Sequence, residues 1–512
     1  YIVKTTCTAT EEVYIKDAAL DLLAVGAFAG LVTKQIYIVG TPLTHLIAGF
    51  LEEAHVSAGI TIENADMTQI AVGTFGGYVV TSDGEDVRPS LTLIGCEKLA
   101  KLETGAFGPL PAVLAALPDG SEFDQPYGEL NIMTCGLTGI EAGAFENVAA
   151  VSVQLAGNKL AGIDGSSFRG LTVGHGGLIV AESKVKEVFP DAFKGLVTTD
   201  GGDLIIGQGL ADSALEGFWP GAFSHATVDG DLMVIRAPKW KSITSGAFGE
   251  LTVAGNILLD ENGVNTVGYG AFTSTTVGGS ITLDSNHLGE NGGKVDAQAF
   301  DALVAKKLSL YDNAHLTQEA IDSSAFLNCE VTDEVILPQT VTYLRYAIIN
   351  STDVLPRLEK LVADGMADGS TCNQAGRGTI TWKGALVCTD CPPNYYCPAA
   401  AQRQSPGAPV PCPEDGTTSG GSVGATSLSQ CSGSDPADDG SLGGGYVFLI
   451  VVCVIGAVAL LIFLLAKFSP TLRDQMARRR DPALSARADA TGIGTHGADL
   501  LADYEEMGDR DL

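Results

Sequence analysis

The sequence predicts a solenoid, in which one short structural unit is stacked repeatedly on the next. The first observation is a recurring Gly-Ala-Phe phrase, exact or approximate, whose phenylalanines are 22 to 38 residues apart. A phrase that returns at this interval marks a repeat architecture. The twelve phenylalanines are Phe28, Phe50, Phe75, Phe107, Phe145, Phe168, Phe193, Phe223, Phe248, Phe272, Phe300 and Phe326.

The second observation is an apolar-x-apolar triplet upstream of each phenylalanine. Alternation with a period of two predicts a strand with one face turned inward, and thirteen such strands would stack as a parallel sheet about 4.8 Å apart. The thirteen triplets are Val13–Ile15, Ile36–Ile38, Ile60–Ile62, Leu91–Leu93, Leu130–Ile132, Val153–Leu155, Leu178–Val180, Leu204–Ile206, Leu232–Val234, Ile257–Leu259, Ile281–Leu283, Leu308–Leu310 and Val335–Leu337.

The third observation is an asparagine three residues after the triplet in the most regular repeats. A buried carboxamide both donates and accepts, so it satisfies backbone groups where the chain turns off the sheet. The asparagines are Asn158, Asn262, Asn286 and Asn313. Cys96 and Cys135 replace Asn in two neighbouring repeats. Four other substitutes, which cannot both donate and accept in this way, are Thr41, Ala65, Gly209 and Ala237.

The complete pattern L-x-L-x-x-N-x-L-x-x-I-x-x-G-A-F-x-x-L resembles the leucine-rich repeat of extracellular receptors and adhesion proteins. The resemblance extends over roughly Val13 to Leu337. It implies a parallel sheet on a concave face and short irregular or helical segments on a convex face. We therefore expect a solenoid of about 13 coils over residues 1–345 and a cap or linker over 346–371. The stretch VAGNILLDEN also resembles the receptor L-domain β-helix, which leaves the cross-section of the coil open.

The middle residue of each triplet is expected on the concave surface, and in most repeats it is polar. Four consecutive repeats instead carry Ile179, Ile205, Met233 and Leu258. At about 4.8 Å per step these form an apolar stripe roughly 15 Å long, rimmed by Asp203, Asp231 and Asp260. Apolar stripes with polar rims mark contact sites, so we predict partner binding here. The alternatives are a slip in the strand register or cover by another domain.

Residues 372–431 hold six of the eleven cysteines, at Cys372, Cys388, Cys391, Cys397, Cys412 and Cys431. Cys388 and Cys391 have zinc-ligand spacing, but no second close pair or histidine accompanies them. Three disulfides are expected instead, with 15 pairings open. The pattern C-x-x-C-P-P-x-Y-Y-C-P followed by P-C-P-x-x-G-T resembles the ephrin-receptor-like cysteine-rich module, here expected to form a stiff stalk. A glycosylation sequon begins at Asn350.

Residues 446–466 predict a transmembrane helix, because 21 consecutive residues carry no charge. A Gly/Ser/Asp linker, 432–445, precedes them, and Lys467 and Arg478–Arg480 follow. This asymmetry orients the chain with its N-terminus outside, as a type I plasma-membrane protein. A signal peptide before Tyr1, removed on maturation, is an assumption that goes with this interpretation.

The remaining segment, 467–512, predicts a disordered cytoplasmic tail. Its basic half would lie against anionic lipid. Its acidic end presents Tyr504, a candidate for phosphorylation or for binding a cytoplasmic adaptor. The alternative is an inert tail.

Charge and motifs restrict the function. Residues 1–466 hold 23 Lys/Arg against 52 Asp/Glu, a net charge of −29, which argues against nucleic acid as a partner. The acidity otherwise serves solubility, or attracts divalent cations. No catalytic motif is found, and we expect no enzyme activity, cofactor or metal. The sequence therefore predicts a recognition or adhesion protein with a protein or glycan ligand. A structural surface-coat or matrix anchor is the alternative, and a membrane-tethered enzyme with an unfamiliar site is a third hypothesis.

Overall fold

The structure is a computed structural model. It describes residues 10–51, 54–75, 89–107, 127–181, 184–207, 213–234, 236–344, 360–362, 372, 374–382, 385–398, 409–412 and 424–431. The chain divides into two compact units, Tyr1–Gly433 and Ser434–Leu512, and every described residue belongs to the first.

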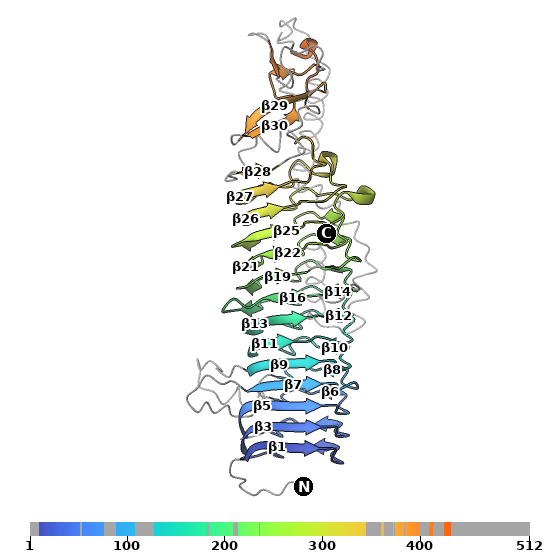
Figure 1. Cartoon of the computed structure of the whole chain (residues 1–512), viewed down its shortest axis with the longest axis vertical. Coiled ribbons are helices and arrows are strands. Elements are labelled where there is room, and N and C mark those ends of the chain that lie inside the picture. The colour runs from blue at the N-terminus through green and yellow to red at the C-terminus, as the bar shows by residue number, and fades with distance from the viewer. Residues whose placement is uncertain are drawn as a thin grey trace, which may run out of the picture. The chain divides into compact units, whose positions relative to one another are not determined.

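The dominant element is a parallel sheet of 18 strands among the described residues (Figure 1), and it contains at least the first two residues of each of the thirteen predicted triplets. Its strands follow one another coil by coil, so the fold is a parallel β-solenoid. Toward the two ends of the stack each strand is continuous. These strands are β1 (Thr10–Lys16), β3 (Val32–Val39), β5 (His55–Glu63), β7 (Ser90–Ile94), β9 (Tyr127–Met133), β11 (Ala149–Gln154), β13 (Thr172–Val180), β26 (Val304–Ser309), β27 (Glu330–Ile336) and β28 (Lys360–Val362).

Between β13 and β26 each coil contributes two short strands separated by a glycine-containing corner. The first members of the pairs are β15 (Val197–Thr198), β18 (Thr227–Val228), β21 (Thr252–Val253) and β24 (Thr276–Val277). The second members are β16 (Leu204–Ile206), β19 (Leu232–Met233), β22 (Ile257–Leu258) and β25 (Ser280–Thr282). β13 pairs with both β15 and β16, so the split coils continue the same sheet.

A further line of two-residue strands runs along another side of the stack (Figure 1). These strands are β2 (Leu22–Leu23), β4 (His45–Leu46), β6 (Gln69–Ile70), β8 (Lys101–Leu102), β10 (Gly139–Ile140), β12 (Gly162–Ile163), β14 (Glu187–Val188), β17 (Gly217–Phe218), β20 (Ser242–Ile243) and β23 (Thr266–Val267). Each places one buried side chain in the core, and after β23 isolated bridges that join Val267, Val295 and Ile321 continue the line.

The phenylalanines of the repeated phrase form one continuous internal column. All twelve side chains are buried. Successive ring centroids lie 5.0–6.2 Å apart, within the range of favourable aromatic pairs. The stack predicted from the spacing of the phrase is therefore confirmed.

Of the two alternatives predicted for the convex segments, irregular or helical, the described coils are mostly irregular, and they hold only the short 3₁₀ turns η1 (Glu290–Gly292) and η2 (Gln318–Ala320). The reason is backbone conformation. Gly246 of the phrase has φ +65°, and Glu250, two residues after Phe248, has φ +58°. Because equivalent left-handed residues recur in nearly every coil, a right-handed helix cannot run through the phrase.

The solenoid makes about 11 turns, not the 13 predicted.

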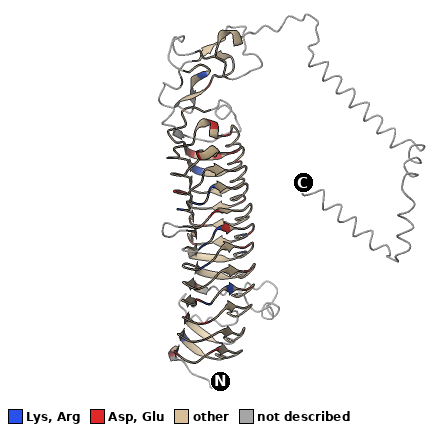
Figure 2. Cartoon of the chain, turned by 90° about the vertical axis from the view of Figure 1, so that its right-hand side faces the viewer, with Lys and Arg blue, Asp and Glu red and all other residues tan. Residues whose placement is uncertain are grey.

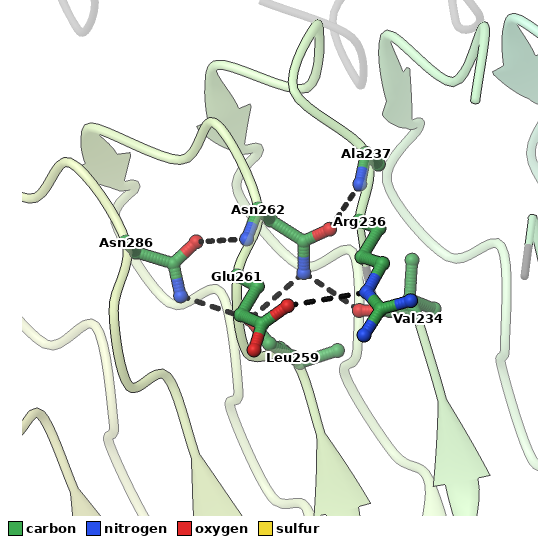
Figure 3. Close-up of polar contacts among 7 residues, drawn as sticks. All are labelled: Val234, Arg236, Ala237, Leu259, Glu261, Asn262 and Asn286. Atoms are coloured by element: carbon green, nitrogen blue, oxygen red, sulfur yellow. Dashed lines mark hydrogen bonds and ion pairs between the residues drawn. The ribbon is translucent and has the colours of Figure 1, made fainter. Parts of the chain in front are cut away.

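The asparagines bind the coils to one another as predicted. The Asn262 Nδ2 donates to the carbonyl oxygens of Val234 in the preceding coil, at 2.6 Å, and of Leu259 in its own coil, at 2.8 Å. Its Oδ1 accepts from the backbone N–H of Ala237 at 2.8 Å (Figure 3). Asn286 continues the line, since its Oδ1 accepts from the N–H of Asn262 at 3.1 Å.

At the same position, Cys96 and Cys135 also contact carbonyl oxygens of the preceding coil, but a thiol is a weaker hydrogen-bond donor than an amide. The Cys135 Sγ lies 3.6 Å from the carbonyl oxygen of Leu93 in the preceding coil, and the Cys96 Sγ lies 3.8 Å from that of Ile62. Cys96, Cys135 and Cys329 are free and buried. The neighbouring thiol and burial raise the pKa of Cys135, so this thiol is a packing group and a donor to carbonyls.

The cysteine-rich region contains three disulfides, as predicted, joining Cys372 to Cys388, Cys391 to Cys397 and Cys412 to Cys431. Its described elements are the antiparallel pair β29 (Arg377–Trp382) and β30 (Ala385–Asp390), the pair β31 (Tyr395–Tyr396) and β32 (Val410–Pro411), and the 3₁₀ turn η7 (Leu428–Cys431).

This region contacts the end of the solenoid. The Arg377 guanidinium lies 3.6 Å from the centroid of the Tyr343 ring, and the Leu344 N–H donates to the Cys388 carbonyl oxygen at 3.0 Å. The Tyr343 hydroxyl donates to Glu319 at 2.9 Å. The cysteine-rich region therefore packs against the last coils.

Within the described ranges, the structure contains no helix with the length and apolar character needed to span a membrane. The predicted transmembrane segment 446–466, the linker 432–445 and the tail 467–512 lie outside the described residues.

Candidate functional site

The middle residues of the triplets form one row across the main sheet, here called the outward row. Strand register pairs each member directly with the next, from Tyr14 and Tyr37 at one end to Ser309 and Ile336 at the other. The intervening members are Thr61, Thr92, Asn131, Gln154, Ile179, Ile205, Met233, Leu258 and Thr282. From Tyr37 onward their triplet neighbours on either side are buried in the core, and Val13 and Ile15 beside Tyr14 are partly buried, so the row lies on the face of the sheet away from the core.

The predicted apolar stripe is contiguous in this row. Ile179 pairs with Ile205, Ile205 with Met233, and Met233 with Leu258. All four side chains are partly exposed. The register therefore has no slip at this point, which removes one of the two alternatives to a contact surface.

The rim carboxylates have a structural role that the sequence did not reveal, and Asp203 and Asp231 show it at the corner. Asp203 and Asp231 lie two residues before the stripe residues Ile205 and Met233. The Asp203 Oδ1 accepts from the backbone N–H of Asp231 in the next coil at 2.8 Å. The Asp231 Oδ1 accepts in turn from Asn256, from its N–H at 2.7 Å and its Nδ2 at 3.0 Å. The carboxylates thus link split coils at the corner where the strand is interrupted.

On the opposite flank, Asp260 lies two residues after the stripe residue Leu258, and Asp284 occupies the same position in the next coil, beside Thr282 and beyond the end of the stripe. The Asp260 Oδ1 accepts from the Asp284 N–H at 2.8 Å, and Asp284 accepts from the Tyr311 N–H at 2.9 Å. Burial, together with the carboxylate of Asp260, raises the pKa of Asp284 above its usual range. The stripe is therefore bordered by carboxylates on both sides. Asp284 was not among the predicted rim residues, although it occupies the position of Asp260 in the following coil.

An aromatic pair at the start of the outward row was also missed. The rings of Tyr14 and Tyr37 stack with centroids 4.5 Å apart, and Tyr14 is exposed. Both are triplet middle residues, so following the row from its first coil would have found them. The outward row thus has an aromatic start, a polar stretch and an aliphatic centre.

Charged residues are distributed along the stack, with acidic residues on several coils (Figure 2). Among the described residues, no group of three or more His, Cys, Asp or Glu side chains is placed to hold a metal ion. The six predicted disulfide cysteines are brought together in pairs. The predicted glycosylation residue Asn350 and the predicted phosphorylation residue Tyr504 lie outside the described residues.

In comparisons with known proteins, no family model and no curated protein matches the chain. The structure itself shows a parallel β-solenoid with a disulfide-rich C-terminal region.

Proposed function

We propose that this chain is a recognition or adhesion protein of the leucine-rich-repeat type, which binds a protein or glycan partner through the outward row. The carrying observation is the stripe of Ile179, Ile205, Met233 and Leu258, which is contiguous and partly exposed in a row that is mostly polar elsewhere. A contiguous apolar surface costs solubility, so its presence in an acidic protein favours a contact role.

The leucine-rich-repeat assignment draws support from the turn position. Asn158, Asn262 and Asn313 each donate to the last triplet carbonyl of the preceding coil, at 2.6, 2.6 and 2.9 Å. This is the role that the resemblance assigns to that asparagine. Three disulfides within a short segment favour an oxidising compartment, such as the outside of the cell. This location is consistent with the ephrin-receptor-like module that the cysteine pattern resembles.

The location follows from residues 446–466. We infer a single-pass type I plasma-membrane protein with the solenoid outside the cell. The basic residues after the membrane segment would contact anionic lipid, and Tyr504 in the tail would bind a cytoplasmic adaptor. The chain would carry no catalytic domain and would signal through its partners. Surface biotinylation of intact cells should label lysines of the solenoid and leave Lys467 unlabelled; labelling of Lys467 alone would reverse the orientation.

The function is tested by placing carboxylates on the stripe. The full-length chain with Ile205→Asp and Met233→Asp is displayed on cells and compared with wild type for capture of native membrane proteins and glycans. We expect capture to be lost while the amount displayed is unchanged. The matched control is Thr61→Asp with Thr92→Asp, on the polar part of the same row.

Equal capture by both double variants and wild type would favour the alternative, a surface-coat or matrix-anchoring spacer. A membrane-tethered enzyme would instead be indicated by turnover in an activity screen that survives both double variants.

A further inference from the structure

The flank of the stripe carries more negative charge than the fold requires. At the corner position, Asp203 and Asp231 each contribute one oxygen to the backbone N–H of the following coil. Asn256 occupies the same position in the next coil, and its neutral Oδ1 accepts from the Ser280 N–H at 2.9 Å. The coil junction therefore needs an acceptor oxygen, which an amide supplies equally well, and it does not need a charge.

The other flank leads to the same conclusion. Asp260 and Asp284 follow the outward row by two residues, and Tyr311 occupies the equivalent position in the next coil. Ala156 and Ala181 occupy the same position in two continuous coils, so a carboxylate is not required there. Burial opposes the charge on Asp284, since it raises the pKa of that group, so ionising it costs stability. Three carboxylates whose charge the fold does not require therefore border the apolar stripe, Asp203 and Asp231 on one side and Asp260 on the other, and Asp284 lies one coil beyond it.

The backbone at this face is not available to an added strand. The stripe residues lie on strands that are paired on both sides within the main sheet, β16 with β13 and β19, and β19 with β16 and β22. A partner that crosses them must bind by side chains alone. An α-helix lying along the stripe presents one side chain per turn, about every 5.4 Å, close to the strand step of about 4.8 Å.

We propose that the stripe binds a basic amphipathic helix of a partner protein, with apolar side chains on Ile179, Ile205, Met233 and Leu258 and with Lys or Arg on both flanks. This rests on the proposed function and names the partner's chemistry. The helix needs about three turns to cover a stripe of roughly 15 Å. Charge complementarity selects a basic helix, because the flanks are acidic on both sides and an acidic helix would meet like charges.

The probe is a synthetic peptide of about 18 residues, with leucines on one helical face and lysines elsewhere, titrated against the full-length chain and followed by fluorescence anisotropy. Two control peptides are used. One has the same composition with the leucines scattered around the helix, and the other has glutamate in place of every lysine. We expect the first peptide to bind at least about tenfold more tightly than either control.

Two variants place the binding on the stripe. Met233→Asp should weaken the probe by about tenfold or more, because it buries a charge in the apolar centre of the contact. Asp203→Asn with Asp231→Asn should weaken it about fivefold at low salt, with a smaller effect at high salt. The thermal unfolding midpoint of this double variant should match wild type, since Asn256 shows that an amide serves the corner.

The matched control removes the same charge elsewhere, with Asp21→Asn and Asp164→Asn, both exposed and off the main sheet. It should leave probe affinity within about twofold. The inference is overturned if this control weakens binding as much as the Asp203/Asp231 variant, or if the peptide with scattered leucines binds as well as the amphipathic one. Either result would mean that the probe responds to overall charge.

The capture experiment separates this inference from the proposed function. If a native partner is lost with Ile205→Asp and Met233→Asp but retained with Asp203→Asn and Asp231→Asn, the recognition surface stands and the basic-helix partner is wrong. If the partner binds all variants equally, both fail.

Discussion

The continuous coils and the split coils build the same sheet with different junctions. In the continuous coils a strand such as β5 pairs with its neighbours through a run of consecutive residues from Gly59 to Glu63. In the split coils the strands are two or three residues long, and side chains at the corner replace the missing strand pairs. A solenoid can therefore lose strand length in one region and keep its stacking, provided that an acceptor oxygen recurs in each coil.

The glycines of the corner explain why the two regions differ. A Cβ on Gly230 would meet the Asp203 Oδ1 and the backbone of Gly201, and one on Gly255 would meet the Asp231 Oδ1 and the backbone of Gly230. The side chain of one coil thus occupies the space above the glycine of the next. The corner therefore needs both the glycine of one coil and the acceptor side chain of the preceding coil. Three of the four stripe residues, Ile205, Met233 and Leu258, lie on coils with this kind of junction.

The largest expected effect tests what both regions share. Phe248→Ala, in a split coil, removes a buried ring that lies 5.1 Å from both Phe223 and Phe272. We expect it to lower the free energy of unfolding by about 4 kcal/mol, because it leaves a cavity in the column. Phe145→Ala, in a continuous coil, should cost a similar amount in urea denaturation. A difference above about 2 kcal/mol would show that the column does not support the regions equally.

The next effect should be confined to the split coils. Gly255→Ala places a methyl group against the Asp231 carboxylate and a backbone carbonyl, and we expect a loss of about 3 kcal/mol from overpacking. Gly139→Ala is the control, since a Cβ there meets nothing within 4 Å. Denaturation midpoints of the two variants check the comparison. If they shift equally, steric exclusion at the corner is not what splits the strands.

The turn position offers a medium-sized effect. Asn262→Ala removes hydrogen bonds to Val234, Leu259 and Ala237, and it leaves the buried Val234 carbonyl oxygen and Ala237 N–H without these partners, whereas the Leu259 carbonyl oxygen still accepts from Asn286. We expect a loss of about 2 kcal/mol. Cys135→Ala should cost about 1 kcal/mol, because the thiol is a weaker donor. Hydrogen exchange at the Ala237 amide gives a local measurement, and unchanged protection in Asn262→Ala would contradict the assigned contact.

The smallest effect concerns pH and the acidic flank. The pKa of Asp284 is raised in the folded state, chiefly by burial, so the folded protein binds this proton more tightly than the unfolded chain. Stability from this group is therefore present at low pH and is lost as pH rises through the folded pKa. Asp284→Asn should flatten that part of the stability–pH curve and leave neutral-pH stability equal or slightly higher. A clear loss at neutral pH would show that the fold needs the charge.

Much of the architecture could be predicted from periodicity. The spacing of Phe28 to Phe326 predicted the internal column, and the triplets predicted the outward row in its correct register. The stripe residues Ile179 to Leu258 were found in the same way, because in a solenoid equivalent sequence positions become spatial neighbours. The cysteines were predicted to pair, but their pairing was open, since nothing in the spacing of Cys372 to Cys431 selects one of the alternatives.

The sequence by itself determined which residues stack, because each coil repeats one pattern and can bury its apolar face only against the next coil. The tertiary structure alone decided how neighbouring coils are joined. It shows that Asp203 and Asp231 accept from backbone N–H groups of the following coil, and that Asp284 occupies the position of Asp260 one coil further on. It also shows that residues of the Gly-Ala-Phe phrase have left-handed backbone conformations, which a right-handed helix excludes. The physical reason is the distance between a side chain and the backbone of the next coil. Whether a carboxylate serves a backbone N–H or only solvent depends on the offset between neighbouring coils, and that offset arises from packing across the whole stack.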